Sequence, residues 1–195
     1  MTAENNILKA RNLGQSIWLD SISRDMLRSG ELKKLVEMGV GGVTSNPSIF
    51  EKAIAESDTY DESLAGYAAD GASVETVFER LAIDDIRDAA DVLRPAYDDA
   101  MGKDGFVSIE VSPRLAYETD GTVEEARRLW AAIDRPNVMI KVPGTPEGIP
   151  AIRQLISEGI NVNVTLLFSI DAYVDAANAY IEGVRAFMTF PYRSV

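Results

Sequence analysis

Two residue types are missing from this sequence of 195 residues, which contains neither cysteine nor histidine. Without cysteine there can be no disulfide, thiolate nucleophile, zinc–thiolate site or iron–sulfur cluster. Without histidine, Ser-His-Asp chemistry, imidazole acid–base catalysis and histidine–metal ligation are excluded. Any catalysis by this chain must therefore rely on lysine, carboxylate, hydroxyl, tyrosine or arginine side chains.

Long apolar runs and an excess of basic residues are lacking as well. No segment approaches the roughly 18 uninterrupted apolar residues of a membrane span, and the start of the chain, MTAENNILKARNLGQS, lacks the layout of a signal peptide. Acidic residues outnumber basic ones by 31 to 19, which gives a formal net charge of −12. Nucleic acids and anionic lipids require a basic footprint. The sequence therefore predicts a cytoplasmic protein that has neither a nucleic acid nor a membrane as partner.

What the sequence does contain is a regular alternation of short apolar runs and longer amphipathic ones. This alternation predicts right-handed βα units around a parallel sheet. A glycine-rich dinucleotide loop would favour a doubly wound sheet, but the first run ends Asp20-Ser21-Ile22-Ser23 without one. We therefore expect a (β/α) barrel architecture. The expected strands cover residues 16–20, 42–46, 106–112, 137–143 and 161–168.

Helix boundaries can also be predicted from local signals. A helical pattern is strongest from Ser73 onward, and Pro95 is expected to end or kink that helix. Thr122 and Glu125 have the spacing of a capping box, which predicts a helix starting there. Ser169 is expected to cap the last helix.

Every expected strand carries a polar residue at or near its C-terminal end. Taken singly, each has an ordinary structural explanation, such as a helix cap, a turn former, an outward strand residue or a snorkelling lysine. In a parallel barrel, however, the C-terminal strand ends converge on the active site. Taken together, these residues therefore predict a functional site. They are Asp20, Asn46, Glu110, Lys141, Asn163 and Thr165.

Lys141 is the most informative of these residues, because it interrupts a strand between Ile140 and Val142. An apolar setting favours the neutral amine, which is a nucleophile that forms a Schiff base with a ketone. The iminium ion then acts as an electron sink for C–C bond cleavage. Glu110 and Asp20 are the available acid–base groups, and the asparagines and Thr165 can hold substrate hydroxyls. This is class I aldolase chemistry, which needs no metal and no organic cofactor.

Four segments resemble the motifs of the transaldolase family, and the resemblance covers residues from about 13 to about 184. The segments are similar to those of the longer bacterial members, some of which are fused to a sugar-phosphate isomerase. The resemblance implies that Lys141 is the Schiff-base lysine and that Asp20 and Glu110 are the acid–base pair. It implies substrate positioning by Asn46, Asn163, Thr165 and Ser169. The segments are GVTSNPSIF (42–50), FVSIEVSPRLAYET (106–119), NVMIKVPGTPEGIPAI (137–152) and GINVNVTLLFS (159–169).

The reaction implied is a transferase reaction of the non-oxidative pentose phosphate pathway. A dihydroxyacetone unit passes from sedoheptulose 7-phosphate to glyceraldehyde 3-phosphate, yielding erythrose 4-phosphate and fructose 6-phosphate. Sugar phosphates are thus the expected partners. Two alternatives stay open at this point: a non-catalytic fragment, or one that needs a partner chain, and a simple class I sugar-phosphate aldolase.

The resemblance implies a full (β/α)₈ barrel, which typically takes about 250 residues. Only five βα units are recognisable here, so we expect an incomplete barrel domain over residues 1–184 and a tail over residues 185–195 that does not resemble the family. The family's sixth strand, with the serine and arginines that bind the substrate phosphate, has no counterpart. An open sheet edge also predicts self-association.

Overall fold

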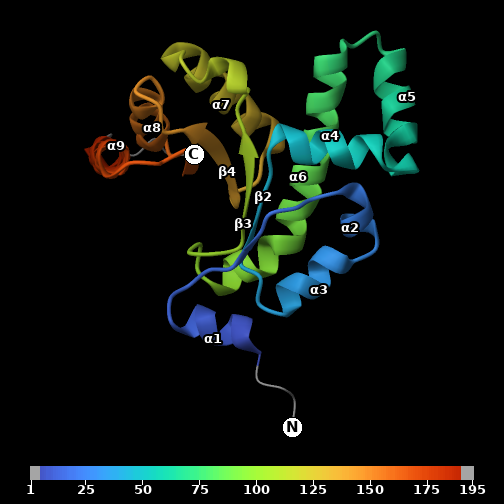
Figure 1. Ribbon diagram of the computed structural model, residues 1–195, viewed down its shortest axis with the longest axis horizontal. Helices are drawn as coiled ribbons and strands as arrows, with labels where there is room; N and C mark the ends of the chain where they lie inside the picture. Colours follow the sequence, from blue (N-terminus) through green and yellow to red (C-terminus); the bar gives the residue numbers. More distant parts are fainter. Residues whose placement is uncertain (1–4, 190–195) are drawn as a thin grey trace. The chain divides into compact units, whose positions relative to one another are not determined.

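The computed structural model describes residues 5–189 and contains one five-stranded sheet (Figure 1). The strands lie in the order β1-β2-β3-β4-β5, and β1 with β2, β2 with β3 and β4 with β5 pair in parallel. A doubly wound sheet reverses its strand order at a switch point, whereas a barrel keeps the chain order. The predicted α/β class is confirmed, with five of the eight strands of a (β/α)₈ barrel. The strands are β1 Trp18–Leu19, β2 Gly42–Thr44, β3 Phe106–Glu110, β4 Val138–Pro143 and β5 Val162–Thr165.

Each strand is followed by one or more helices. Within the part of the chain that is described, no helix combines the length and the apolar character needed to cross a membrane. The α-helices are α1 Asn6–Asn12, α2 Arg24–Arg28, α3 Glu31–Glu37, α4 Pro47–Ala55, α5 Asp61–Ala69, α6 Val74–Asp99, α7 Thr119–Ile133, α8 Gly148–Ser157 and α9 Ile170–Thr189, and the 3₁₀ helices are η1 Asp58–Tyr60 and η2 Pro113–Leu115.

Two helix boundaries differ from the predictions. Helix α6 does not end at Pro95 but continues to Asp99, because its long buried face outweighs the loss of one backbone hydrogen bond; the alternative expectation, a kink at Pro95, stays a prediction. Helix α7 begins at Thr119, so the predicted start at a capping box of Thr122 and Glu125 is wrong. Both side chains instead bind the segment that precedes α7. The Thr122 hydroxyl donates to the Leu115 carbonyl at 3.0 Å, and a Glu125 carboxylate oxygen accepts the Ser112 N–H at 3.2 Å.

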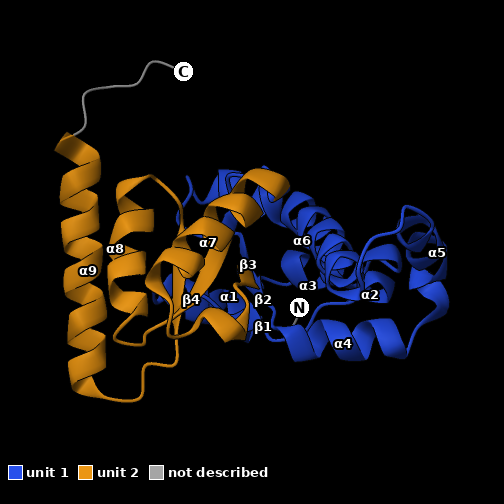
Figure 2. Ribbon diagram, turned by 90° about the horizontal axis from the view of Figure 1, so that it is seen from above, with its two compact units in different colours: residues 1–108, 133–138 blue, residues 109–132, 139–195 orange. Residues whose placement is uncertain are grey.

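The chain divides into two compact units, which Figure 2 shows in different colours. The first comprises residues 1–108 and 133–138, and the second comprises residues 109–132 and 139–195. Strands β3 and β4 each contribute to both units. The predicted domain boundary at residue 184 falls within α9, and residues 190–195 of the predicted tail lie outside the described residues. That boundary stays a prediction.

In the first unit, helices α2, α3 and α5 pack against α6 (Figure 1). A buried polar network joins three of its elements. Arg24 Nε donates to one Asp85 oxygen at 2.8 Å, and the Tyr60 hydroxyl donates to the other at 2.7 Å. The same hydroxyl accepts the Arg24 backbone N–H at 2.9 Å. Burial and the bond to Asp85 raise the pKa of Tyr60, so its phenol remains a donor and the network stays satisfied.

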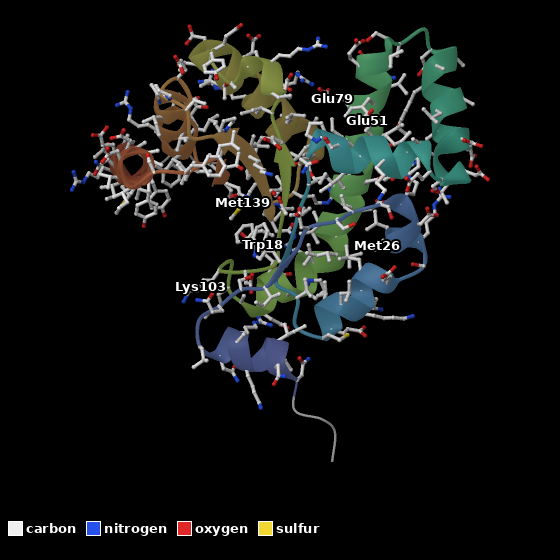
Figure 3. The ribbon with its side chains drawn as sticks, viewed as in Figure 1. Trp18, Met26, Glu51, Glu79, Lys103 and Met139 are labelled. Atoms are coloured by element: carbon white, nitrogen blue, oxygen red, sulfur yellow. The ribbon has the colours of Figure 1, made fainter. Side chains whose placement is uncertain are left out.

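The sheet of the first unit depends on a glycine at the start of β2. A Cβ atom at Gly42 would lie 2.4 Å from the indole ring of Trp18, its register partner on β1. Only glycine therefore lets Trp18, which is labelled in Figure 3, lie across the neighbouring strand. On the next strand pair, the Ser108 hydroxyl donates to the Thr44 hydroxyl at 3.2 Å. Polar and aromatic side chains thus occupy the face opposite the buried Val43 and Val107.

In the second unit, helices α7, α8 and α9 follow β3, β4 and β5 in turn. Helices α8 and α9 lie side by side (Figure 2). Their close approach requires Gly183 on α9, because a Cβ atom there would lie 2.8 Å from both the Arg153 carbonyl oxygen and the Ile156 side chain. Helices α7 and α8 are linked by Arg127, whose guanidinium donates to both carboxylate oxygens of Glu158.

Candidate active site

The second unit brings Lys141 and Glu110 together on neighbouring strands. The Lys141 Nζ atom lies 3.5 Å from the Glu110 Oε2 atom, and both side chains are only about 15% exposed. The strands are held in register there by the Val111 N–H, which donates to the Lys141 carbonyl at 3.2 Å. Two of the residues predicted from the sequence thus form a partly buried ion pair within the second unit.

The alternation along β3 and β4 explains why these charges share a face. Ile109, Val111, Ile140 and Val142 are buried on the opposite face of the sheet. Because strand side chains alternate between faces, Glu110 and Lys141 point away from that apolar layer. Met139, labelled in Figure 3, lies two residues before Lys141 and is half-buried on the same face. The lysine is therefore desolvated by the sheet without being sealed in the core.

Strand β5 places two further predicted residues beside this pair. In the parallel register, Asn163 is the partner of Lys141, and Thr165 is the partner of Pro143. Register partners on adjacent strands present their side chains on the same face, and both β5 side chains are half-buried. An amide and a hydroxyl thus flank the amine on the side away from Glu110, where they can bind hydroxyls of a ligand.

The loop after β4 is fixed by two glycines and one threonine that sequence reasoning did not select. A Cβ atom at Gly148 would lie 2.0 Å from the Pro143 carbonyl oxygen, and one at Gly144 would lie 2.5 Å from the Leu167 side chain. The Thr145 hydroxyl accepts the Gly148 N–H at 3.0 Å and donates to the Ala116 carbonyl at 2.6 Å. The Thr-x-x-Gly spacing before α8 is the signal that could have identified this loop anchor.

The remaining predicted residues occupy helix starts or lie in the other unit. Asn46 caps α4, with its Oδ1 atom accepting the Ile49 N–H at 2.9 Å. Ser169 caps α9 as predicted, and its hydroxyl accepts the Ala172 N–H at 3.1 Å. Asp20 is exposed directly after β1. Asp20 and Asn46 belong to the first unit and Ser169 to the second, and their roles toward a substrate stay predictions.

The Lys141–Glu110 pair is suited to reversible proton transfer. Attack on a carbonyl group requires a neutral amine, so a proton must leave the amine before it reacts. The Glu110 carboxylate lies 3.5 Å from the amine, close enough to exchange a proton with it. The sequence predicted an amine made neutral by apolar neighbours, and that protonation state stays a prediction. A lysine beside a carboxylate is an arrangement that covalent catalysis at a carbonyl group can use.

Comparisons with known proteins identify the family to which this chain is similar. Residues 17–193 match the model of a family described as transaldolase/fructose-6-phosphate aldolase. A transaldolase of Thiobacillus denitrificans is 56% identical over 92% of this chain and 50% of its own length. Transaldolases of Trichodesmium erythraeum and Mycobacterium tuberculosis are 52% and 50% identical over 93% and 94% of this chain. The chain spans about half the length of these relatives.

Proposed function

The chain belongs to the transaldolase/fructose-6-phosphate aldolase family, and we propose that it carries the Schiff-base chemistry of a transaldolase. The observation that supports this most strongly is the 3.5 Å pair of Lys141 and Glu110 on adjacent strands. The proposed substrates are ketose and aldose phosphates, with a dihydroxyacetone unit passing between them. The reaction would belong to the non-oxidative pentose phosphate pathway.

The proposed reaction runs through the amine of Lys141. After losing a proton to Glu110, the amine attacks the ketone carbon, and the carbinolamine leaves water and an iminium ion. A carboxylate then takes the proton of the hydroxyl group on the β carbon, and the bond between the α and β carbons breaks with its electron pair passing into the iminium, so that an aldehyde departs and an enamine remains. The enamine attacks the acceptor aldehyde, and water then releases the new ketose. Glu110 exchanges the protons of imine formation and hydrolysis, while Asn163 and Thr165 bind hydroxyls of the retained unit.

The transfer step can be tested with fructose 6-phosphate as donor and erythrose 4-phosphate as acceptor. We expect sedoheptulose 7-phosphate and glyceraldehyde 3-phosphate to form with the chain and none to form with Lys141→Arg, because a guanidinium stays protonated. Lys103→Arg, a change at an exposed lysine, is the matched control and should retain the activity. Equal turnover by Lys141→Arg and the unmodified chain would overturn the proposal.

A simple aldolase is the second candidate, because the family description covers fructose-6-phosphate aldolase as well. The two activities differ in the fate of the three-carbon unit. An aldolase releases free dihydroxyacetone from fructose 6-phosphate when no acceptor is added, whereas a transaldolase retains it as the enamine. Multiple turnovers of dihydroxyacetone release without acceptor would favour the aldolase.

A third candidate is a half that acts only with a partner chain, since this chain covers about half of its relatives. Absence of turnover by a folded chain that still forms a Schiff base would favour it. The cytoplasmic location, the acid–base role of Asp20, the substrate contacts of Asn46 and Ser169 and the self-association at the sheet edge stay predictions.

A further inference from the structure

Two threonine hydroxyls join the loops that follow β3 and β4. The Thr145 hydroxyl, in the loop after β4, donates to the Ala116 carbonyl in the loop after β3 at 2.6 Å. In return, the Thr119 hydroxyl, where the β3 loop enters α7, donates to the Glu147 carbonyl in the β4 loop at 2.7 Å. Each loop thus donates one hydroxyl bond to the other and accepts one from it. We call this reciprocal pair of hydrogen bonds the threonine latch.

The threonine latch lies in a partly shielded place. All four of its residues are half-buried, and both distances are those of well-formed hydroxyl–carbonyl bonds. Loss of either hydroxyl would leave a carbonyl that water reaches poorly without its donor, which costs more than loss of an exposed bond. The latch should therefore stay closed while the second unit is folded.

On one side, the latch is connected to the strand that carries Lys141. The Thr145 hydroxyl also accepts the Gly148 N–H at 3.0 Å. A Cβ atom at Gly148 would lie 2.0 Å from the Pro143 carbonyl oxygen, so the loop folds back closely on the last residue of β4. Because Pro143 is two residues after Lys141, a shift of this loop would reach the strand that holds the amine.

On the other side, the latch is connected to the strand that carries Glu110. The β3 loop is fastened to α7 at two points, because the Thr122 hydroxyl donates to the Leu115 carbonyl and a Glu125 oxygen accepts the Ser112 N–H. Ser112 is two residues after Glu110. The latch thus joins two short, tightly held segments, each of which begins within two or three residues of one member of the ion pair.

We propose that Thr145 and Thr119 are positioning residues that hold the Lys141 amine and the Glu110 carboxylate at the spacing that proton transfer requires. The strands are still joined at the pair by the Val111 N–H, which donates to the Lys141 carbonyl, and the latch closes the loops just beyond that bond. This inference rests on the proposed Schiff-base function. A misplacement of about 1 Å at a reacting centre can cost about 10²-fold in rate, so a small opening of the loops is enough to matter.

The first test measures borohydride trapping of Lys141 with fructose 6-phosphate in Thr145→Val, which lacks the hydroxyl. The trapping rate at saturating sugar should fall at least about tenfold. The half-saturating concentration should change less than about twofold, because the proposed sugar-binding groups lie on β5. Thr145→Ser restores the hydroxyl and should recover the rate to within about threefold. Thr76→Val is the same substitution at a hydroxyl of the first unit that bonds Ser73, and it should leave the rate unchanged.

The two hydroxyls act as one latch only if the loss of either one opens it. Thr119→Val should therefore slow trapping to a similar extent as Thr145→Val. The double variant should be slower than the slower single variant by no more than about twofold, because coupled residues are not additive. Effects that multiply would mean that the two bonds act separately, and would overturn the latch.

A second measurement, which needs no sugar, separates this proposal from the proposed function. Formaldehyde and cyanoborohydride methylate lysines, and the rate at Lys141 relative to Lys103 in the same sample reports the setting of the amine. We expect this ratio to change at least about threefold in Thr145→Val and Thr119→Val but not in Thr145→Ser, because a neighbouring base alters the reactivity of an amine.

A changed ratio in a chain that fructose 6-phosphate does not trap would contradict the Schiff-base chemistry while supporting the latch. An unchanged ratio in variants that circular dichroism shows to be folded would overturn the latch. Trapping of Thr145→Val within about twofold of the unmodified chain, or failure of Thr145→Ser to restore the rate, would overturn it as well.

Discussion

At the scale of single residues, the pairing of Lys141 with Glu110 is the feature on which the proposed chemistry depends. The two side chains are close because their strands are neighbours and because period-2 alternation gives them one face. Burial removes most of the competing water from both groups. A single carboxylate can then serve both directions of proton transfer without any imidazole, which this chain lacks.

The first prediction concerns Glu110. Glu110→Gln should slow Schiff-base formation by about 10²–10⁴-fold, the usual contribution of a general acid–base group. The measurement is the rate at which borohydride traps the lysine adduct in rapid-quench samples. Glu124→Gln, an exposed position on α7, is the matched control and should leave the rate unchanged. A trapping rate for Glu110→Gln within threefold of the unmodified chain would contradict this role.

The second prediction concerns the buried network of the first unit. Asp85→Ala leaves the buried Arg24 guanidinium without its carboxylate, so the free energy of unfolding should fall by about 3–5 kcal/mol. Urea denaturation measures this. Asp91 lies on the same helix as Asp85 and pairs with Arg135 in a more exposed position. Asp91→Ala should therefore lower the free energy of unfolding far less, because water screens that pair. Similar losses in the two variants would refute a special role for burial.

At the scale of elements, the packing of α8 on α9 makes a glycine necessary in a helix interior. Gly183→Ala should destabilise the chain, because the added Cβ would lie 2.8 Å from a backbone oxygen of α8, although alanine favours helix by up to about 1 kcal/mol. Gly66→Ala, in the open on α5, should raise stability by about 0.5–1 kcal/mol. The melting temperatures of Gly183→Ala and Gly66→Ala, measured by circular dichroism, should therefore shift in opposite directions from that of the unmodified chain. A stabilising Gly183→Ala would show that the helices lie farther apart.

The link between α7 and α8 predicts a pH dependence. The Arg127 guanidinium lowers the pKa of Glu158 from its ordinary value of 4.5, so this ion pair stabilises the folded state above that pH. Its contribution is lost as the pH falls through the lowered pKa. The stability difference between the unmodified chain and Arg127→Ala should thus be present at pH 7, vanish in acid and shrink in high salt. Arg114→Ala, a change at another exposed arginine, is the control and should show no comparable pH-dependent difference. A difference that persists at pH 2 would contradict the electrostatic origin.

Comparison of sequence and structure shows which features local patterns can predict. Alternating apolar runs located all five strands, and the polar residues at their ends anticipated the neighbouring positions of Glu110 and Lys141. The capping box at Thr122 was misread because both of its side chains bind residues that precede α7, which starts about one turn earlier, at Thr119. Likewise, Arg24 and Asp85 are 61 residues apart. No local signal relates them, because their pairing arises from the packing of α2 on α6.

At the scale of the whole molecule, the chain matches its family over nearly all of its own length but over only half of its relatives. The resemblance places the phosphate-binding serine and arginines of the family on a sixth strand, and no strand follows β5 within residues 5–189. Binding energy from a remote phosphate group normally orients the substrate at the reacting centre. The site on β3, β4 and β5 should therefore have its chemical groups without that source of affinity.

This predicts weak discrimination between phosphorylated and unphosphorylated ketoses. For the chain alone, we compare the second-order rates at which borohydride traps the lysine adduct of fructose 6-phosphate and that of fructose. We expect the two rates to differ by less than about tenfold, or about 1.4 kcal/mol. Phosphate ions should inhibit neither reaction. A preference for fructose 6-phosphate of several hundredfold would show that the described chain already holds a phosphate site.

The central claim, that Lys141 forms a Schiff base, is tested most directly by covalent trapping. The chain is incubated with fructose 6-phosphate and reduced with borohydride, and its intact mass is measured before peptide mapping. We predict the mass gain of a reduced sugar or dihydroxyacetone adduct on the peptide that contains Lys141, and no gain for Lys141→Ala. A folded chain that remains unmodified, or one modified at another lysine, would contradict the claim.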